Sequence, residues 1–176
     1  MNSIIYYSPE EIERAFFIAS QNQNQNYVRF ILLWASFNSR ISRDSEEVRD
    51  ADMIRWVKRN CSRYRRRFQE LIENDNEFVI LFNQLQNVRV INFLEFKKRA
   101  KAIREGTQRQ DQPEFKQIRR GREFSSLMDV IYLVRCNLIH GSKNIEQPGE
   151  IELAEICYYI LLKLYRDDIE ELIENF

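Results

Sequence analysis

The sequence contains little glycine and proline: 4 Gly and 3 Pro in 176 residues. These two residue types form many of the tight turns in proteins, because glycine adopts positive φ angles and proline fixes φ in advance. Their scarcity, together with many Glu, Arg, Leu and Ile residues, favours helices. The composition therefore predicts a mainly helical protein, and a chain of this length suits a single domain spanning 1–176.

Long apolar runs and a cysteine framework are also lacking. No stretch of about 18 uncharged apolar residues occurs, so we expect no membrane-spanning segment. The N-terminal sequence MNSIIYYSPEEIERAFF has no basic start and soon becomes acidic, so we expect no signal peptide. Cys61, Cys136 and Cys157 are odd in number and widely spaced, as in a reducing compartment. We expect a cytoplasmic protein without a cofactor or a bound metal.

The chain lacks a net charge, since 27 basic residues balance 27 acidic ones. The distribution is nevertheless uneven. Lys97–Arg122 is strongly basic, Arg63–Arg67 contains four arginines, and the C-terminal segment is acidic. Such asymmetry can attract a polyanion, of which RNA is one, to one face, and Arg119, Arg120 and Arg122 are our candidates for that contact. Charge alone, however, favours the alternative of a solvated helix surface with internal ion pairs.

Capping signals and apolar spacing place the first helices. Ser8–Glu11 reads SPEE, a capping box with proline at the first helical position. The polar repeat at 21–26 is interpreted as a connection or an exposed stretch of helix. Helical spacing then predicts three further helices. They are marked by Phe30, Leu33, Trp34, Phe37 and Ile41; by Val48, Met53, Trp56 and Val57 after a start near Asp44 or Ser45; and by Tyr64, Phe68, Leu71 and Ile72.

The second half of the chain is less uniform. Glu77–Phe96 fits either strands or buried helices, and since no hairpin turn accompanies it we predict short helices. The segment 104–121 is polar, basic and bounded by glycines, and is predicted to be a mobile loop. Apolar stripes at 127–138 and 154–165 predict two clear helices, the first ending near Gly141. The sequence as a whole predicts an all-α bundle of about five to seven helices.

Histidine is nearly absent, and His140 is the only one. It lies in VRCNLIHGSK (134–143), five positions after Arg135. On an ideal helix these two positions are about 140° apart, so they converge only if the terminal turn is irregular. Gly141 makes such an irregular helix end plausible on stereochemical grounds. The spacing alone favours an ordinary polar residue at a helix end.

The chemistry of the pair suits phosphodiester cleavage. An imidazole that titrates near neutral pH transfers protons to and from a ribose oxygen. A guanidinium holds a phosphate through two parallel hydrogen bonds and stabilises developing negative charge. One histidine does not easily act as both base and acid, so a second copy across a symmetric interface, or water, would supply the other role. The sequence contains no glycine-rich phosphate loop, zinc motif or nucleophile elbow.

Two stretches resemble the HEPN superfamily. IYLVRCNLIHGSK (131–143) is similar to its R-x4-6-H motif near the end of a core helix, and RFILLWASFNSRI (29–41) resembles an early helix of bacterial HEPN-type proteins. The resemblance implies a helical bundle, a homodimer and a metal-independent endoribonuclease whose motif residues meet across the dimer. It also implies a toxin or phage-defence setting, in which an antitoxin protein would be a further partner.

By the same resemblance Arg135 and His140 are the catalytic residues, with Asn137 and Lys143 in supporting roles. HEPN proteins often place asparagine directly after the arginine, whereas this chain has Cys136, which we expect to pack as a small apolar group. This departure leaves two alternatives open. One is a non-catalytic HEPN module that binds RNA, a nucleotide or a protein partner, and the other is a structural bundle without a ligand site.

Overall fold

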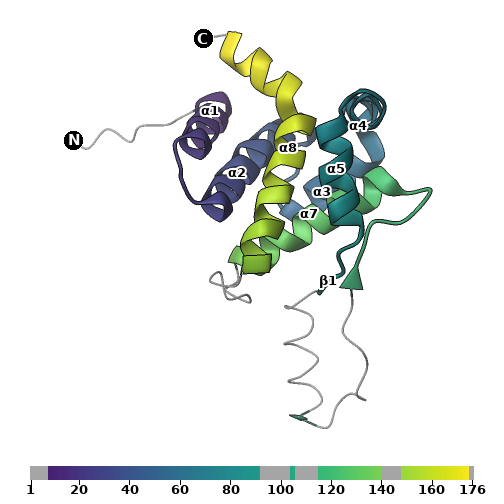
Figure 1. Ribbon diagram of the computed structural model, residues 1–176. Helices are drawn as coiled ribbons and strands as arrows, with labels where there is room; N and C mark the ends of the chain where they lie inside the picture. The colour runs from purple at the N-terminus through teal and green to yellow at the C-terminus, as the bar shows by residue number, and fades with distance from the viewer. Residues whose placement is uncertain (1–7, 92–103, 106–114, 140–147, 175–176) are drawn as a thin grey trace.

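The computed structural model describes residues 8–91, 104–105, 115–139 and 148–174 (Figure 1). Within these ranges the chain forms seven α-helices and one pair of two-residue strands, which confirms the predicted all-α bundle. The elements are α1 (Pro9–Gln21), α2 (Asn26–Ser45), α3 (Asp50–Asn60), α4 (Ser62–Asn74), α5 (Asn76–Gln86), β1 (Val90–Ile91), β2 (Phe115–Lys116), α7 (Glu123–Ile139) and α8 (Pro148–Glu174).

Helix α1 begins as the sequence predicts. The Ser8 side chain accepts a hydrogen bond from the backbone of Glu11, and the Glu11 carboxylate accepts one from the backbone of Ser8. Pro9 stands at the first helical position, where its missing N–H has no intrahelical partner to lose. The polar repeat forms the end of α1 and the connection to α2, as interpreted from the sequence.

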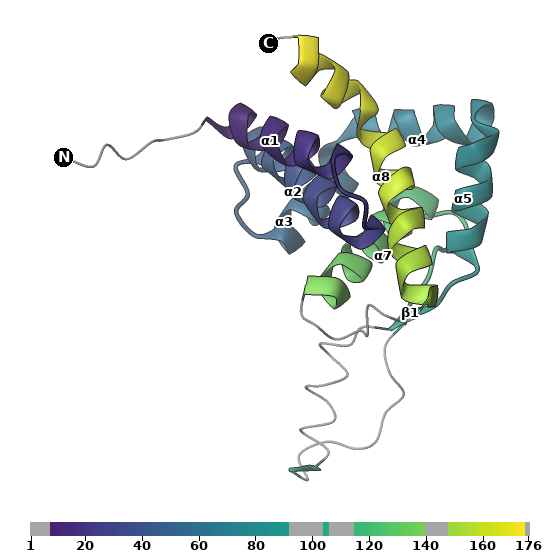
Figure 2. The same ribbon diagram turned by 60° about the vertical axis from the view of Figure 1, so that its left-hand side comes forward.

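The core is centred on α2, α7 and α8. Both views show α8 crossing the bundle, with α1 and α2 on one side and α5 on the other (Figure 1, Figure 2). The ring of Phe37 on α2 lies 5.5 Å from that of Tyr64 on α4 and 5.5 Å from that of Tyr165 on α8. Large apolar side chains buried in this way contribute about 1.5–3 kcal/mol each, so the aromatic cluster fixes how these helices pack.

A buried ionic network reinforces the same helices. The Tyr64 hydroxyl donates to the carboxylate of Asp168 on α8, which is only 5% exposed. Arg40 on α2 and Arg63 on α4 both approach the same carboxylate, at 3.4 Å each. Burial raises the pKa of Asp168, while the Tyr64 hydrogen bond and the two arginines oppose that rise. Arg63, from the arginine cluster at 63–67, thus pairs with a carboxylate of the bundle although its side chain remains 36% exposed.

One predicted helix has different bounds. Helix α2 continues to Ser45 and ends at Glu46, whose φ of 60° is left-handed, and α3 begins only at Asp50. Met53 and Val57 are buried as predicted, but Val48 is 86% exposed. The expectation that Val48 points inward was wrong because it lies in the connection between the two helices, where helical periodicity does not apply.

The described part of Glu77–Phe96, which is residues 77–91, follows the helical prediction only in part. It is helical to Gln86, but Val90–Ile91 forms β1, which pairs antiparallel with β2 in the register Val90↔Lys116. The predicted loop at 104–121 therefore contains a strand, and its Ile118 is buried. Residues 92–103 and 106–114 lie outside the described residues. None of the helices that the structure describes has both the length and the apolar character needed to cross a membrane.

Candidate functional site

Helix α7 carries the predicted catalytic arginine. Most of its side chains are buried in the core, because it packs against α2, α3, α8 and the strand pair. A stripe at spacings of three and four residues is only half-buried and remains accessible. This stripe is made of Ser125, Asp129, Tyr132, Arg135 and Cys136.

Arg135 is held by a carboxylate from a different helix. Its Nη2 lies 2.7 Å from Oδ2 of Asp50, in the first turn of α3, and both side chains are largely buried. The other carboxylate oxygen of Asp50 accepts a hydrogen bond of 2.9 Å from Nδ2 of Asn38 on α2. Asp50 therefore joins the two stretches that resemble HEPN proteins, since Asn38 belongs to one and Arg135 to the other.

The rest of the guanidinium is weakly engaged. Its Nη1 meets only the Cys136 sulfur, at 4.0 Å, and its Nε is buried without a hydrogen-bond partner among the described residues. An arginine has five N–H donors, so a single carboxylate leaves it with unused hydrogen-bonding capacity. Arg135 is thus fixed in place by Asp50 while retaining donors suited to an anion.

Tyr132 lies one turn before Cys136 on the same stripe. Its ring stacks on Trp34 of α2, with centroids 5.9 Å apart. Burial, followed by a hydrogen bond and electrostatic interaction with Cys136 and the charge of Asp50, raises the pKa of Tyr132 to about 12. Tyr132 is therefore a neutral hydroxyl near pH 7. Cys136 is half-buried and contacts both Tyr132 and Arg135, so its surroundings are more polar than the expected apolar packing.

Asn137 occupies the opposite side of α7 from Arg135, because two residues advance a helix by about 200°. Its side chain is 2% exposed, and its Nδ2 donates to the backbone oxygen of Ile91 in β1 at 2.9 Å. The structure therefore shows Asn137 anchoring the strand pair. His140 and Lys143 lie outside the described residues, and α7 is described to Ile139, the residue directly before His140.

Two of the three candidate RNA-binding residues come together in one cleft. Arg119 and Arg122 line it, whereas Arg120 does not, although all three residues are exposed. The cleft has a volume of about 180 Å³. Its other lining residues are Lys58, Lys116, Gln117, Ser125, Ser126 and Asp129. Sequence reasoning missed Lys58, because only the fold brings the end of α3 to this part of α7.

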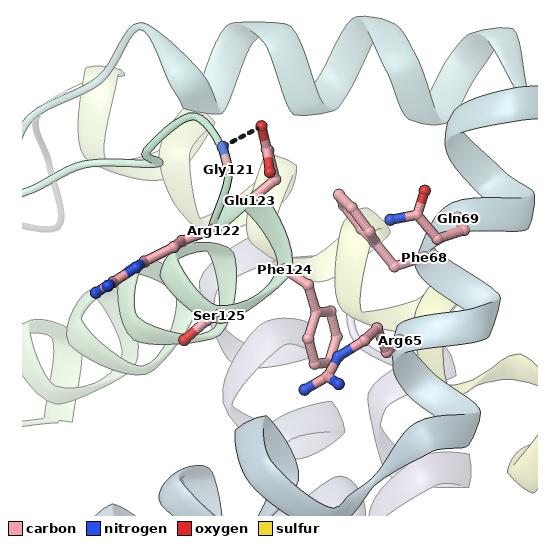
Figure 3. A pocket seen from close by; sticks show the side chains of 8 residues that line it. All are labelled: Arg65, Phe68, Gln69, Gly121, Arg122, Glu123, Phe124 and Ser125. Atoms are coloured by element: carbon pink, nitrogen blue, oxygen red, sulfur yellow. Dashed lines mark hydrogen bonds between the residues drawn. The ribbon is translucent and has the colours of Figure 1, made fainter.

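A second cavity, of about 260 Å³, lies on the other side of the turn before α7 (Figure 3). It is bordered by Arg65, Gln69 and the aromatic side chains of Phe68 and Phe124. Figure 3 shows the Arg122 side chain extending away from Phe68 and Arg65. Although Arg122 borders both hollows, its guanidinium is thus directed away from this aromatic cavity.

The other basic cluster is mostly paired within the chain. Arg63 binds Asp44 and Asp168, Arg66 and Arg67 approach Glu70, and Arg65 donates to the backbone oxygen of Lys58. These contacts agree with the alternative of a surface with internal ion pairs for Arg63–Arg67. Among the residues that the structure describes, no three His, Cys, Asp or Glu side chains gather as a possible metal site.

Comparison with known proteins adds no residue assignment. No protein-family model, curated protein or solved structure matches this chain. The functional interpretation therefore rests on the residues themselves and on their geometry.

Proposed function

We propose that the protein is a metal-independent endoribonuclease of HEPN type, in which Arg135 and His140 act together at a composite site across a homodimer. The observation that supports this most directly is the Asp50–Arg135 ion pair, with Nη2 and Oδ2 2.7 Å apart. It holds a guanidinium near the end of the described part of α7, and the only histidine of the chain follows five positions later in the sequence. A toxin or phage-defence role, with an antitoxin protein as partner, is proposed from the sequence resemblance alone.

The proposed reaction uses the ribose hydroxyl as the nucleophile. His140 accepts the proton of a 2′-hydroxyl, whose oxygen then attacks the adjacent phosphorus atom. The bond from phosphorus to the 5′-oxygen breaks, and that oxygen takes a proton from water or from a second copy of His140 across the symmetric interface. The products are a 2′,3′-cyclic phosphate and a 5′-hydroxyl.

Arg135 stabilises the negative charge that develops on the phosphate oxygens. Its fixed position contributes to catalysis, because a side chain that is already ordered loses less conformational freedom when the substrate binds. Asp50 also partly neutralises the guanidinium, so the substrate phosphate shares Arg135 with that carboxylate. In this mechanism Asp50 is a positioning residue and makes no contact with the reacting atoms.

The same ion pair, with Cys136 beside it, favours a second candidate function. An arginine whose charge is already balanced by Asp50 binds a phosphate less strongly than a free one. A HEPN-type module that binds RNA, a nucleotide or a protein partner without cutting RNA does not need a guanidinium with its full charge available to a phosphate. RNA binding without cleavage distinguishes this candidate from the enzyme.

The experiment is incubation of the purified protein with end-labelled RNA in the presence of excess EDTA. The proposal predicts shorter fragments that end in a 2′,3′-cyclic phosphate, which acid treatment or a phosphatase assay identifies. Cleavage that stops on chelation and returns with a divalent ion would contradict the metal-independent mechanism. RNA that the protein binds with a measurable dissociation constant but does not cut would support the non-catalytic module instead.

A further inference from the structure

The cleft beside the start of α7 has the size and charge of a phosphate-binding site. We propose that it binds a backbone phosphate of the single-stranded RNA substrate, a few nucleotides from the bond that is cut. This inference rests on the proposed function, since it assigns the substrate a path along α7 toward Arg135.

Positive charge dominates this cleft. Four cationic side chains line it, from Lys58, Lys116, Arg119 and Arg122, and Asp129 is the only carboxylate among the lining residues. Nζ of Lys58 binds that carboxylate at 2.7 Å, so the negative charge of Asp129 is already balanced by Lys58. In the part of the chain that the structure describes, no carboxylate forms an ion pair with the guanidinium of Arg119 or Arg122. Both therefore remain available to an anion.

The backbone around the two arginines is fixed by local contacts. Ile118 is buried and anchors the segment next to the strand pair. The backbone N–H of Arg119 donates to Oγ of Ser126 at 2.9 Å, and that of Arg122 donates to the backbone oxygen of Arg119 at 3.1 Å. Gly121 has a φ of 72°, which favours glycine and turns the chain into α7. The two guanidinium groups thus extend from an ordered turn, and binding requires little reorganisation.

The volume of the cleft limits what it holds. At about 180 Å³ it is smaller than the roughly 300–1,000 Å³ of sites that enclose drug-sized molecules. A phosphate group fits such a space, whereas a stacked base needs an aromatic surface, and none of the lining residues is aromatic. Ser125 borders the cleft as well, and serine side chains are common partners of phosphate oxygens.

The cleft and Arg135 lie on the same seam between two helices. Lys58, near the end of α3, meets Asp129 on α7, and Asp50, at the start of α3, meets Arg135. The two helices therefore run antiparallel, with the cleft near one end and the proposed catalytic arginine at the other. From Ser125 to Arg135 the rise along α7 is about 15 Å, a distance that a few nucleotides of an extended strand cover. The half-buried stripe of α7 lies between them.

The test compares two double variants that remove the same charge. Arg119→Gln with Arg122→Gln empties the cleft of its two arginines, whereas Arg55→Gln with Arg166→Gln removes two exposed arginines outside it. Binding is measured by fluorescence anisotropy over a series of salt concentrations. The probe is a 2′-O-methyl RNA strand of ~12 nucleotides, which lies within the range of known single-strand sites. This probe lacks the attacking hydroxyl, so the result does not depend on cleavage.

The cleft variant is expected to bind the probe about tenfold more weakly or worse, the loss typical of charged hydrogen bonds. Its plot of log K against log salt should be shallower by about one unit, because a phosphate contact has been removed. The control variant should retain the wild-type slope. Thermal melts establish that both variants are folded, as expected for exposed substitutions.

Three results would overturn the proposal. Unchanged binding by the cleft variant excludes a phosphate contact there, and an equal loss in both variants shows a general effect of charge. Inorganic phosphate and a dinucleotide serve as competitors in the third arm. If either competitor displaces the probe at the same concentration as an unlabelled long RNA strand does, the cleft is a site for free phosphate. A different result would separate the two proposals. If the cleft variant loses binding but the wild-type protein leaves RNA uncut in the cleavage assay, the nuclease activity is contradicted and the phosphate site is supported.

Discussion

Asp50 and Arg135 join the start of α3 to the end of α7 through one ion pair, with Nη2 and Oδ2 2.7 Å apart. Asn38 completes the arrangement by donating to the second oxygen of the carboxylate. Both charged side chains are mostly shielded from water, so the pair is stronger than an exposed salt bridge, which contributes roughly 0–1 kcal/mol. The orientation of Arg135 thus depends on a residue that makes no direct contact with a substrate in the proposed mechanism.

Asp50→Ala is expected to lower kcat for RNA cleavage by at least about tenfold while KM changes little, because Arg135 loses the partner that orients it. Asp52→Ala is the matched control. Asp52 lies on the same helix and binds Arg55 rather than Arg135, so its loss should leave kcat unchanged. Steady-state kinetics on a fluorescent RNA measure both variants. Equal kcat values for Asp50→Ala and wild type would show that the ion pair has no positioning role.

Asp75 links α5 to α8, and its contribution should depend on pH. Its side chain caps α5 at the N–H of Phe78 and binds Lys163 at 2.8 Å. The hydrogen bond from Lys163, then that from Phe78, lowers the pKa of Asp75. A lowered folded-state pKa gives stability that is fully present above the unfolded value of about 3.9 and is lost as pH falls through the folded pKa.

Asp75→Ala should therefore lower the free energy of unfolding by about 0.5–2 kcal/mol at neutral pH, as for other lost helix caps. The difference from wild type should shrink as pH falls below about 3.9. Asp75→Asn retains a capping oxygen and should lose less. Urea unfolding at several pH values measures these differences, and a loss for Asp75→Ala that stays constant into acid would rule out the ionised carboxylate as its source.

Glu13 is fully buried, and its charge should make the protein less stable as pH rises. The Tyr165 hydroxyl donates to one carboxylate oxygen, and Arg43 lies 3.1 Å from the other. Burial outweighs both contacts and raises the pKa of Glu13. A raised folded-state pKa favours folding below the unfolded value of about 4.3, and this advantage is lost as pH rises through the folded pKa.

Glu13→Gln should flatten the dependence of stability on pH between about 4.3 and neutrality, because the amide keeps an acceptor for Tyr165 without a titrating charge. Asp168 also has a raised pKa, so part of the slope should remain. Urea unfolding across this range checks the prediction. A profile identical to that of wild type would mean that Glu13 does not titrate there.

The sequence predicts local features of the fold better than distant ones. The capping box at Ser8 and the stripes of α7 and α8 were readable because each depends on residues within a few turns. Strand β1 was missed because its partner, β2, lies beyond a long intervening segment. Val48 was misplaced because the end of α2 at Glu46 is set by a left-handed residue without a glycine signal.

The candidate site shows the same division. Arg135 was identified from a short motif, but Asp50 resembled an acidic residue that favours the start of any helix. Lys58 likewise resembled a basic residue in the last turn of α3. Only the packing of α3 against α7 brings Asp50 to Arg135 and Lys58 to the cleft, and no local pattern carries that information. Asn137 was assigned to the site by its neighbours in sequence, whereas the helix turns it toward Ile91.

We propose that His140 transfers protons in RNA cleavage, and the most direct test of this role is the His140→Ala variant, assayed for cleavage and by thermal melt. If His140 is the proton carrier, we expect cleavage to be abolished while stability changes by roughly 0.5 kcal/mol or less, a shift of about 1–2 °C in Tm. The account would be contradicted if the variant cleaved RNA like wild type. It would also be contradicted if Tm fell markedly and the remaining activity matched the fraction of folded protein.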